Sequence, residues 1–188
     1  MTTKCELLFI QGGGKGAHDD WDSKLVASLR QGLGQGYEIR YPRLPHEDEP
    51  QYARWKHALD TELAALGDDA IVVAHSVGAT ALLKVLSEQP PLRRFGALFF
   101  LAAPFVGAGG WVTDDLQLPL DLGARLPKDV PTLFYHGLED RVAPPSHVDL
   151  YARAVPQARV HRLPGRDHQL NNDLKEVAAA IVALQPAK

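Results

Sequence analysis

Short apolar runs separated by turn-forming residues recur along the chain of 188 residues. Runs 71–74 and 97–101 are apolar at every position, a pattern typical of strands that are covered on both faces of a sheet. Glycine, proline and polar residues lie between the runs, as expected where strands end. The pattern predicts six strands, the last of them the weakest: 7–10, 37–41, 70–74, 96–101, 132–135 and 158–163.

Between these runs, apolar residues recur at spacings of three and four, which is the spacing of one helix face. The helical stripes begin at Trp21, Tyr52, Leu82 and Leu174. Ser146 followed by Asp149 predicts a capping box that opens a further helix through Tyr151. Because alternating strands and helices indicate βαβ units with right-handed crossovers, we expect an α/β fold. It would be a three-layer sandwich with helices on both faces of a mostly parallel six-stranded sheet, in the order 2-1-3-4-5-6.

Residues 104–128 interrupt the alternation between the fourth and fifth runs. The segment is rich in glycine and proline, and it contains only one short stretch, 114–118, that is predicted to be helical. It is too small to be a second domain and too long to be a plain turn. We therefore expect one domain over residues 1–188, with a flap-like insertion at about 104–128.

The composition is that of a soluble globular domain, with 45% hydrophobic residues and 20 Lys+Arg against 23 Asp+Glu. This near balance gives no basic surface for nucleic acid or an anionic membrane, so we expect neither as a partner. Cys5 is the only cysteine, and residues 1–10 are too charged for a signal peptide, which predicts a cytoplasmic protein. No pair of histidines has the spacing of a metal motif, so we expect no metal and no cofactor.

Ser76 lies where the apolar run 71–74 gives way to a helical stretch. A nucleophile on a sharp turn from strand to helix needs small residues two before and two after it, and Ala74 and Gly78 occupy these positions. The helix N-terminus directs the Val77 amide and the helix dipole toward a developing anion. The pattern predicts Ser76 as a nucleophile and Val77 as one donor of an oxyanion hole.

A serine nucleophile needs a base and an acid that orients the base. Asp140 follows the fifth run and His168 follows the sixth, each in the loop at the carboxyl end of a strand. Because the carboxyl ends of parallel strands share one edge of the sheet, both residues can converge with Ser76. Residues 12–14, all glycine, form a glycine loop after the first strand. Gly13 is the expected second oxyanion donor, since glycine allows the main chain to come close to the oxyanion.

Other candidates in the sequence carry weaker signals. Glu139 and Asp167 are alternative acids, but Asp167 adjoins His168, and neighbouring side chains diverge. His75 and His136, at strand ends, are interpreted as structural, and the remaining histidines are expected on the surface: His18, His46, His57, His147 and His161.

Residues 12–17 also fit the dinucleotide fingerprint G-x-G-x-x-A. The helix of that motif should begin at its third small residue, whereas helical periodicity begins only near Trp21. No acid follows the second run, where Tyr41, Pro42 and Arg43 stand. Both points favour the nucleophile interpretation over a dinucleotide site.

The chain resembles the α/β-hydrolases, and in particular the small lidless serine hydrolases similar to the retinoblastoma-binding-protein-like group. The resemblance extends over the motifs at 7–14, 74–78, 136–140 and 165–168. It implies that Ser76 is the nucleophile, Asp140 the acid and His168 the base. Many of these hydrolases have a histidine before the oxyanion glycine, whereas this chain has Gln11.

Together, the residues and the resemblance predict a serine hydrolase of the carboxylesterase type. It would cleave a small ester or amide through an acyl-enzyme, with a small-molecule acyl substrate as its partner. Two alternatives stay open: a catalytically silent binding protein that keeps the hydrolase fold, and a dinucleotide-binding oxidoreductase.

Overall fold

The computed structural model describes residues 4–184 of the chain. Six strands form one sheet in the order β2-β1-β3-β4-β5-β6, and every neighbouring pair is parallel. The strands are β1 (Cys5–Ile10), β2 (Tyr37–Arg40), β3 (Ala70–His75), β4 (Phe95–Leu101), β5 (Thr132–Gly137) and β6 (Arg159–Leu163). The predicted α/β fold and strand order are therefore confirmed.

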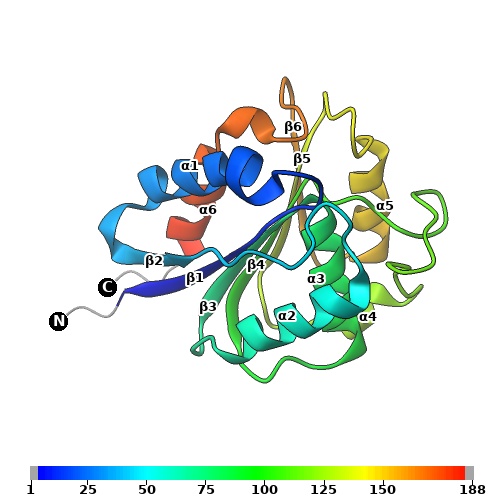
Figure 1. Ribbon diagram of the computed structural model, residues 1–188, viewed down its shortest axis with the longest axis horizontal. Coiled ribbons are helices and arrows are strands. Elements are labelled where there is room, and N and C mark those ends of the chain that lie inside the picture. Colours follow the sequence, from blue (N-terminus) through cyan, green and yellow to red (C-terminus); the bar gives the residue numbers. More distant parts are fainter. Residues whose placement is uncertain (1–3, 185–188) are drawn as a thin grey trace.

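Helices cover both faces of the sheet (Figure 1). One face carries α1 (Ser23–Leu33) and α6 (Lys175–Leu184), which pack against each other. The other face carries α2 (Tyr52–Ala64), α3 (Ser76–Glu88), α4 (Leu122–Arg125) and α5 (Ser146–Ala154). Each layer of helices encloses its own apolar core against the sheet, so the predicted three-layer sandwich is also confirmed.

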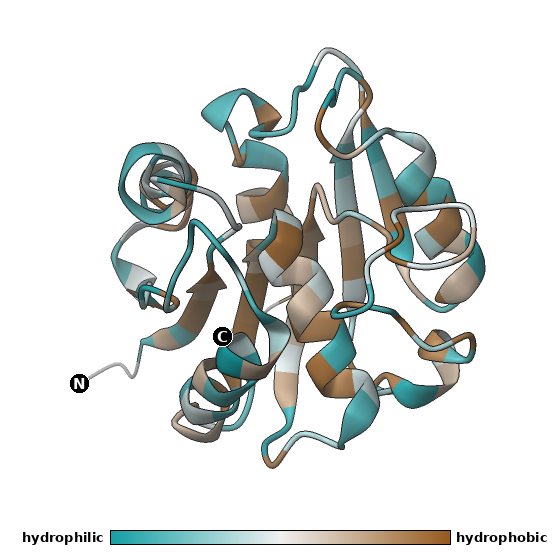
Figure 2. Cartoon of the chain, turned by 45° about the vertical axis from the view of Figure 1, so that its right-hand side comes forward, coloured by the Kyte–Doolittle hydropathy of each residue, from teal (hydrophilic) through white to brown (hydrophobic). Residues whose placement is uncertain are grey.

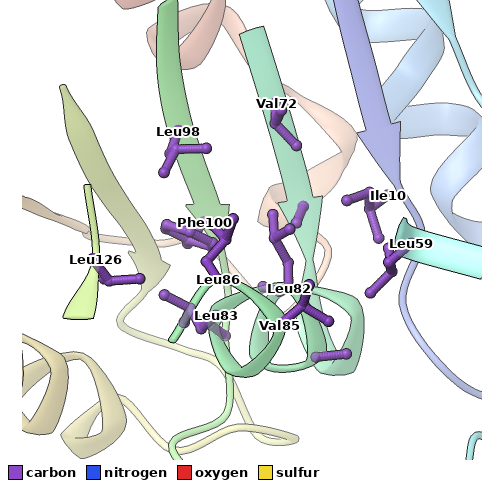
Figure 3. Close-up of a cluster of buried hydrophobic side chains, with 14 of the residues drawn as sticks. Ile10, Leu59, Val72, Leu82, Leu83, Val85, Leu86, Leu98, Phe100 and Leu126 are labelled. Atoms are coloured by element: carbon purple, nitrogen blue, oxygen red, sulfur yellow. The ribbon is translucent and has the colours of Figure 1, made fainter. Parts of the chain in front are cut away.

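Helix α3 is the most deeply buried helix of the second layer. Leu82 and Leu86 belong to the cluster that includes Val72 of β3 and Phe100 of β4 (Figure 3). The hydropathy colouring shows the same arrangement, with apolar strands inside and polar residues on the outer helix faces (Figure 2). Close packing on both sides of β3 and around α3 leaves the junction between them little freedom to move.

The strand register aligns the carboxyl ends of neighbouring strands. Ile10 at the end of β1 pairs with Ala74 near the end of β3. Gly137 at the end of β5 pairs with Leu163 at the end of β6. The loops that follow these strands therefore emerge at one edge of the sheet, as is typical of ligand sites in open α/β sheets.

Several local predictions are wrong. Residues 114–118 are not helical, and the short helix of the 104–128 segment is α4 at Leu122–Arg125. Ser146 makes no capping bond, because Pro145 is the N-cap of α5 and Asp149 instead accepts hydrogen bonds from Arg162. The first helix begins earlier than predicted, with a π-helical turn η1 (Ala17–Asp22) that leads directly into α1. The early start removes one of the two arguments against the dinucleotide fingerprint.

The prediction of one domain with a flap-like insertion stays a prediction. Its outermost residues, 1–3 and 185–188, lie outside the described part of the chain.

Candidate active site

Ser76 lies at the sharp turn between β3 and α3, with a φ of 50°. Non-glycine residues rarely adopt this left-handed conformation, and strain of this kind is concentrated at functional sites. Gly78 makes the turn feasible, because a Cβ there would lie 1.9 Å from the carbonyl oxygen of Gln11. The predicted sharp turn from strand to helix at Ser76 is therefore present, and its geometry depends on contact between α3 and the end of β1.

The structure brings Ser76, His168 and Asp140 together in one chain of hydrogen bonds. Nε2 of His168 lies 2.9 Å from Oγ of Ser76, and Nδ1 of His168 lies 2.7 Å from Oδ2 of Asp140. These residues are separated by 92 and 28 positions in the sequence. The arrangement allows the imidazole to accept the serine proton while the carboxylate holds the opposite ring nitrogen.

Asp140 is buried, and both of its carboxylate oxygens accept hydrogen bonds. Its Oδ1 accepts main-chain hydrogen bonds from Val142 at 2.8 Å and from Ala143 at 2.9 Å. Burial alone would raise the pKa of Asp140, but hydrogen bonds from His136, His168 and the Val142 amide outweigh it and hold that pKa well below its usual range. Asp140 is therefore a fixed negative charge beneath His168.

His168 is largely buried, with 14% of its side chain exposed. Burial lowers the pKa of His168 below its ordinary value, the hydrogen bond with Asp140 opposes this shift, and the nearby His75 adds to it. The net direction is downward. The ring is therefore held in its neutral form at neutral pH, which is the form that accepts a proton.

The two alternative acids occupy other positions. Glu139 and Asp167 are exposed at the edge of the cavity beside Ser76. Asp167 accepts a hydrogen bond from the main chain of Asn171 within its own loop. In residues 4–184, the carboxylate that bonds to His168 is Asp140.

The glycine loop after β1 lies against the start of α3. A Cβ built on Gly13 would lie 3.6 Å from Cβ of Val77, so the two predicted oxyanion residues are neighbours. The amide of Val77 belongs to the first turn of α3, where N–H groups have no partner within the helix. Both residues line the cavity beside Ser76. Their role as oxyanion donors stays a prediction.

Gln11, which directly precedes the glycine loop, anchors it through hydrogen bonds of its side chain. Its buried side chain accepts a hydrogen bond from the Leu44 amide at 2.8 Å and donates one to Glu47 at 2.7 Å. Glu47 also accepts, through its main-chain oxygen, a hydrogen bond from the Gly14 amide. The glutamine therefore joins the glycine loop to residues 44–47 and does not itself line the cavity.

A cavity of about 680 Å³ opens beside Ser76 and His168. This volume lies within the range of sites for small molecules. Its apolar walls are Ala17, Trp21, Val77, Trp111 and Val142, and its charged rim is Lys15, Glu139, Arg141 and Asp167. The arrangement can hold a small molecule with an apolar part beside the serine hydroxyl.

The 104–128 segment contributes Trp111 to this cavity. Buried His147 of α5 anchors the segment, because its Nδ1 accepts a hydrogen bond from the Phe105 amide at 3.0 Å and its ring packs edge-on against Trp111. The expectation that His147 lies on the surface is therefore wrong. Burial lowers the pKa of His147, which agrees with an unprotonated Nδ1 acceptor.

A second buried histidine and carboxylate, His75 and Asp22, line the same cavity as Ser76. Nδ1 of His75 lies 2.9 Å from Oδ1 of Asp22, and both side chains are almost completely buried. The sequence pattern predicts a structural role for His75 and gives no signal for Asp22. No periodicity relates the two residues, which are 53 positions apart.

No group of three or more His, Cys, Asp or Glu residues between 4 and 184 is arranged to hold a metal ion. In the same part of the chain, no helix is both long enough and apolar enough to span a membrane.

The fold is similar to that of several solved structures. The chain superimposes on the ydeN gene product from B. subtilis with a TM-score of 0.79 at 16% sequence identity, covering 97% of this chain and 98% of that one. XC6422 from Xanthomonas campestris, described as an α/β serine hydrolase without a lid, gives 0.67 at 17% identity, covering 98% and 84%. The esterase domain of a Rhodothermus marinus protein gives 0.66 at 19% identity, covering 96% and 87%.

No curated protein matches the chain in sequence. The family model described as Serine hydrolase matches residues 7–173, which include Ser76, Asp140 and His168. The resemblance to small α/β-hydrolases is thereby confirmed, and the chain belongs to the serine hydrolase family.

Proposed function

We propose that this hydrolase cleaves a small carboxylic ester, or an amide, through an acyl-enzyme formed on Ser76. The observation that carries the proposal is the hydrogen-bonded chain of Ser76, His168 and Asp140 at the edge of an open cavity. A serine hydroxyl alone is a weak nucleophile. The neutral imidazole of His168, 2.9 Å from Oγ of Ser76, can accept the hydroxyl proton as Oγ attacks.

In the first half of the reaction, Oγ of Ser76 attacks the carbonyl carbon while Nε2 of His168 accepts the hydroxyl proton. The Gly13 and Val77 amides donate hydrogen bonds to the oxyanion that forms. His168 then gives the proton to the leaving alcohol or amine, which departs and leaves the acyl group on Ser76. Water attacks the acyl-enzyme in the second half, again with His168 as the base, and releases the acid.

The cavity walls support a substrate with an apolar acyl part. Trp21, Trp111 and Val142 offer apolar surface next to Ser76, and the cavity is open on one side. A site without a large lid gives a long chain few further contacts, so the proposal favours short acyl chains. The carboxylesterase type and the small-molecule acyl partner are parts of this proposal.

Hydrolysis of p-nitrophenyl esters and labelling by a fluorophosphonate probe test the proposal together. We expect turnover that is highest for short acyl chains and covalent labelling at Ser76, read by peptide mass spectrometry. A protein that folds but neither hydrolyses esters nor reacts with the probe would instead be a silent binding protein. Labelling at a residue other than Ser76 would contradict the assigned nucleophile.

The pH dependence of ester hydrolysis should follow the protonation of His168. Because the pKa of His168 lies below its ordinary value of 6.5, kcat/KM should rise with pH through a midpoint below that value and then level off. The sign follows from the base role, since activity is lost as falling pH protonates the ring. A midpoint above 6.5, or no acid limb at all, would count against His168 as the base.

A further inference from the structure

Asp22 and His75 form a buried ion pair at the wall of the cavity that Ser76 also lines, and the hydrogen bonds of the His75 ring fix its charge. Nδ1 of His75 lies 2.9 Å and 3.1 Å from the two carboxylate oxygens of Asp22, and Nε2 lies 3.1 Å from the carbonyl oxygen of His168. The His168 carbonyl oxygen and the ionised Asp22 carboxylate are both acceptors, whereas a neutral imidazole has only one N–H. Only the imidazolium satisfies both contacts.

Other donors keep Asp22 ionised. Its Oδ2 accepts a hydrogen bond of 2.6 Å from the Gly12 amide, and its Oδ1 lies 3.4 Å from Nε2 of Gln169. Burial alone would raise the pKa of Asp22 and lower that of His75, but each charge outweighs this effect at the other group. The pKa of Asp22 is lowered and that of His75 is raised.

The ion pair joins the segments that carry the reacting groups. Asp22, at the end of η1, holds the glycine loop through Gly12. His75, the last residue of β3, holds the loop after β6 through the carbonyl of His168. The fit is tight, because a Cβ on Gly12 would lie 3.2 Å from Nδ1 of His75 and 3.1 Å from Cβ of Ser76.

We propose that His75, held as an imidazolium by Asp22, is a positioning residue that fixes the His168 main chain and the glycine loop and adds to the effect of burial in keeping the His168 ring neutral. The inference rests on the proposed function, because it assigns His75 a part in preparing the base. His75 touches neither substrate nor reacting atoms in this assignment, and it acts through His168.

The protonation of the His168 ring depends on the charged groups around it. His75 lies with its ring centroid 5.1 Å from that of His168. His136 of β5 acts in the same direction as His75, and the Asp140 carboxylate opposes both. Removing the His75 charge leaves Asp140 less opposed, so protonation of His168 becomes easier.

Two substitutions remove the charge and keep part of the hydrogen bonding. His75→Gln keeps an amide donor for the His168 carbonyl, and Asp22→Asn keeps an oxygen for the Gly12 amide. Without its carboxylate partner, buried His75 becomes neutral. We expect each variant to lower plateau kcat by about 10-fold with KM nearly unchanged, and to move the acid limb of kcat/KM upward by about one pH unit.

His161→Gln is the matched control, because His161 is a half-buried histidine on β6 that stacks on Tyr135 away from the cavity. Its pH profile should overlay that of the wild-type protein. If His75→Gln and Asp22→Asn reduce activity equally at every pH and leave the acid limb in place, the pair is only a structural core contact and the proposal is wrong.

Ring ¹⁵N NMR of the wild-type protein gives a test that survives misfolding of both variants. We expect both ring nitrogens of His75, assigned through contacts with Gly12, to be protonated at pH 7, where an ordinary histidine with a pKa of about 6.5 is mostly neutral. A neutral His75 ring there overturns the inference. Fluorophosphonate labelling of the same sample keeps the questions apart: unlabelled Ser76 with a charged His75 refutes the proposed function, whereas labelled Ser76 with a neutral His75 refutes this inference alone.

Discussion

Ser76→Ala should reduce kcat/KM for a short p-nitrophenyl ester by about 10⁴- to 10⁶-fold and abolish fluorophosphonate labelling. The reason is chemical, because alanine offers no oxygen for the acyl-enzyme. Residual turnover would come only from the amides and the binding surface. Thermal unfolding should show an intact fold, since alanine removes one hydroxyl from a largely buried site.

Ser87→Ala provides the matched control on the same helix. Ser87 lies at the far end of α3, where its hydroxyl donates to the Lys84 carbonyl at 2.8 Å. This variant should keep full labelling and nearly full turnover. Substantial esterase activity in purified Ser76→Ala would contradict the assignment of the nucleophile.

Asp140→Asn should lower kcat by about 10⁴-fold, as expected when the base is held in the wrong tautomer. The surroundings of Oδ1 dictate how an asparagine would sit. Two main-chain N–H groups, from Val142 and Ala143, point at that oxygen, so the amide oxygen would stay there. The amide NH₂ would then face Nδ1 of His168, and the ring proton would move to Nε2, where it blocks proton transfer from Ser76.

The neighbouring acids test whether this effect is specific. Asp167→Asn and Glu139→Gln remove charges at the cavity edge and leave the hydrogen bond between Asp140 and His168 in place. Each should change kcat by less than about 10-fold, because neither acid orients the base. A loss in Asp167→Asn that equals the loss in Asp140→Asn would show that the orienting acid has been misassigned.

The strands could be predicted because apolar runs identify buried parallel strands. The convergence of Ser76, Asp140 and His168 could also be predicted, because parallel topology collects the strand ends at one edge. The π-helical turn η1 could not be predicted, since its polar residues at 18–20 give no apolar stripe. The buried positions of His147 and of the Asp22 and His75 pair depend on tertiary contacts that no local pattern encodes.

Gly78 limits how this site can be engineered. The missing side chain at position 78 decides how closely Gln11, after β1, approaches α3. The glycine loop follows Gln11 directly, and Val77 directly precedes Gly78. A methyl group at position 78 would disturb the packing of α3 against the end of β1, and it would also move the Gly13 and Val77 amides apart. Variant libraries designed for new substrates should therefore keep glycine at position 78. They should diversify Trp21, Trp111 and Val142, which line the cavity but do not set the distance between the Gly13 and Val77 amides.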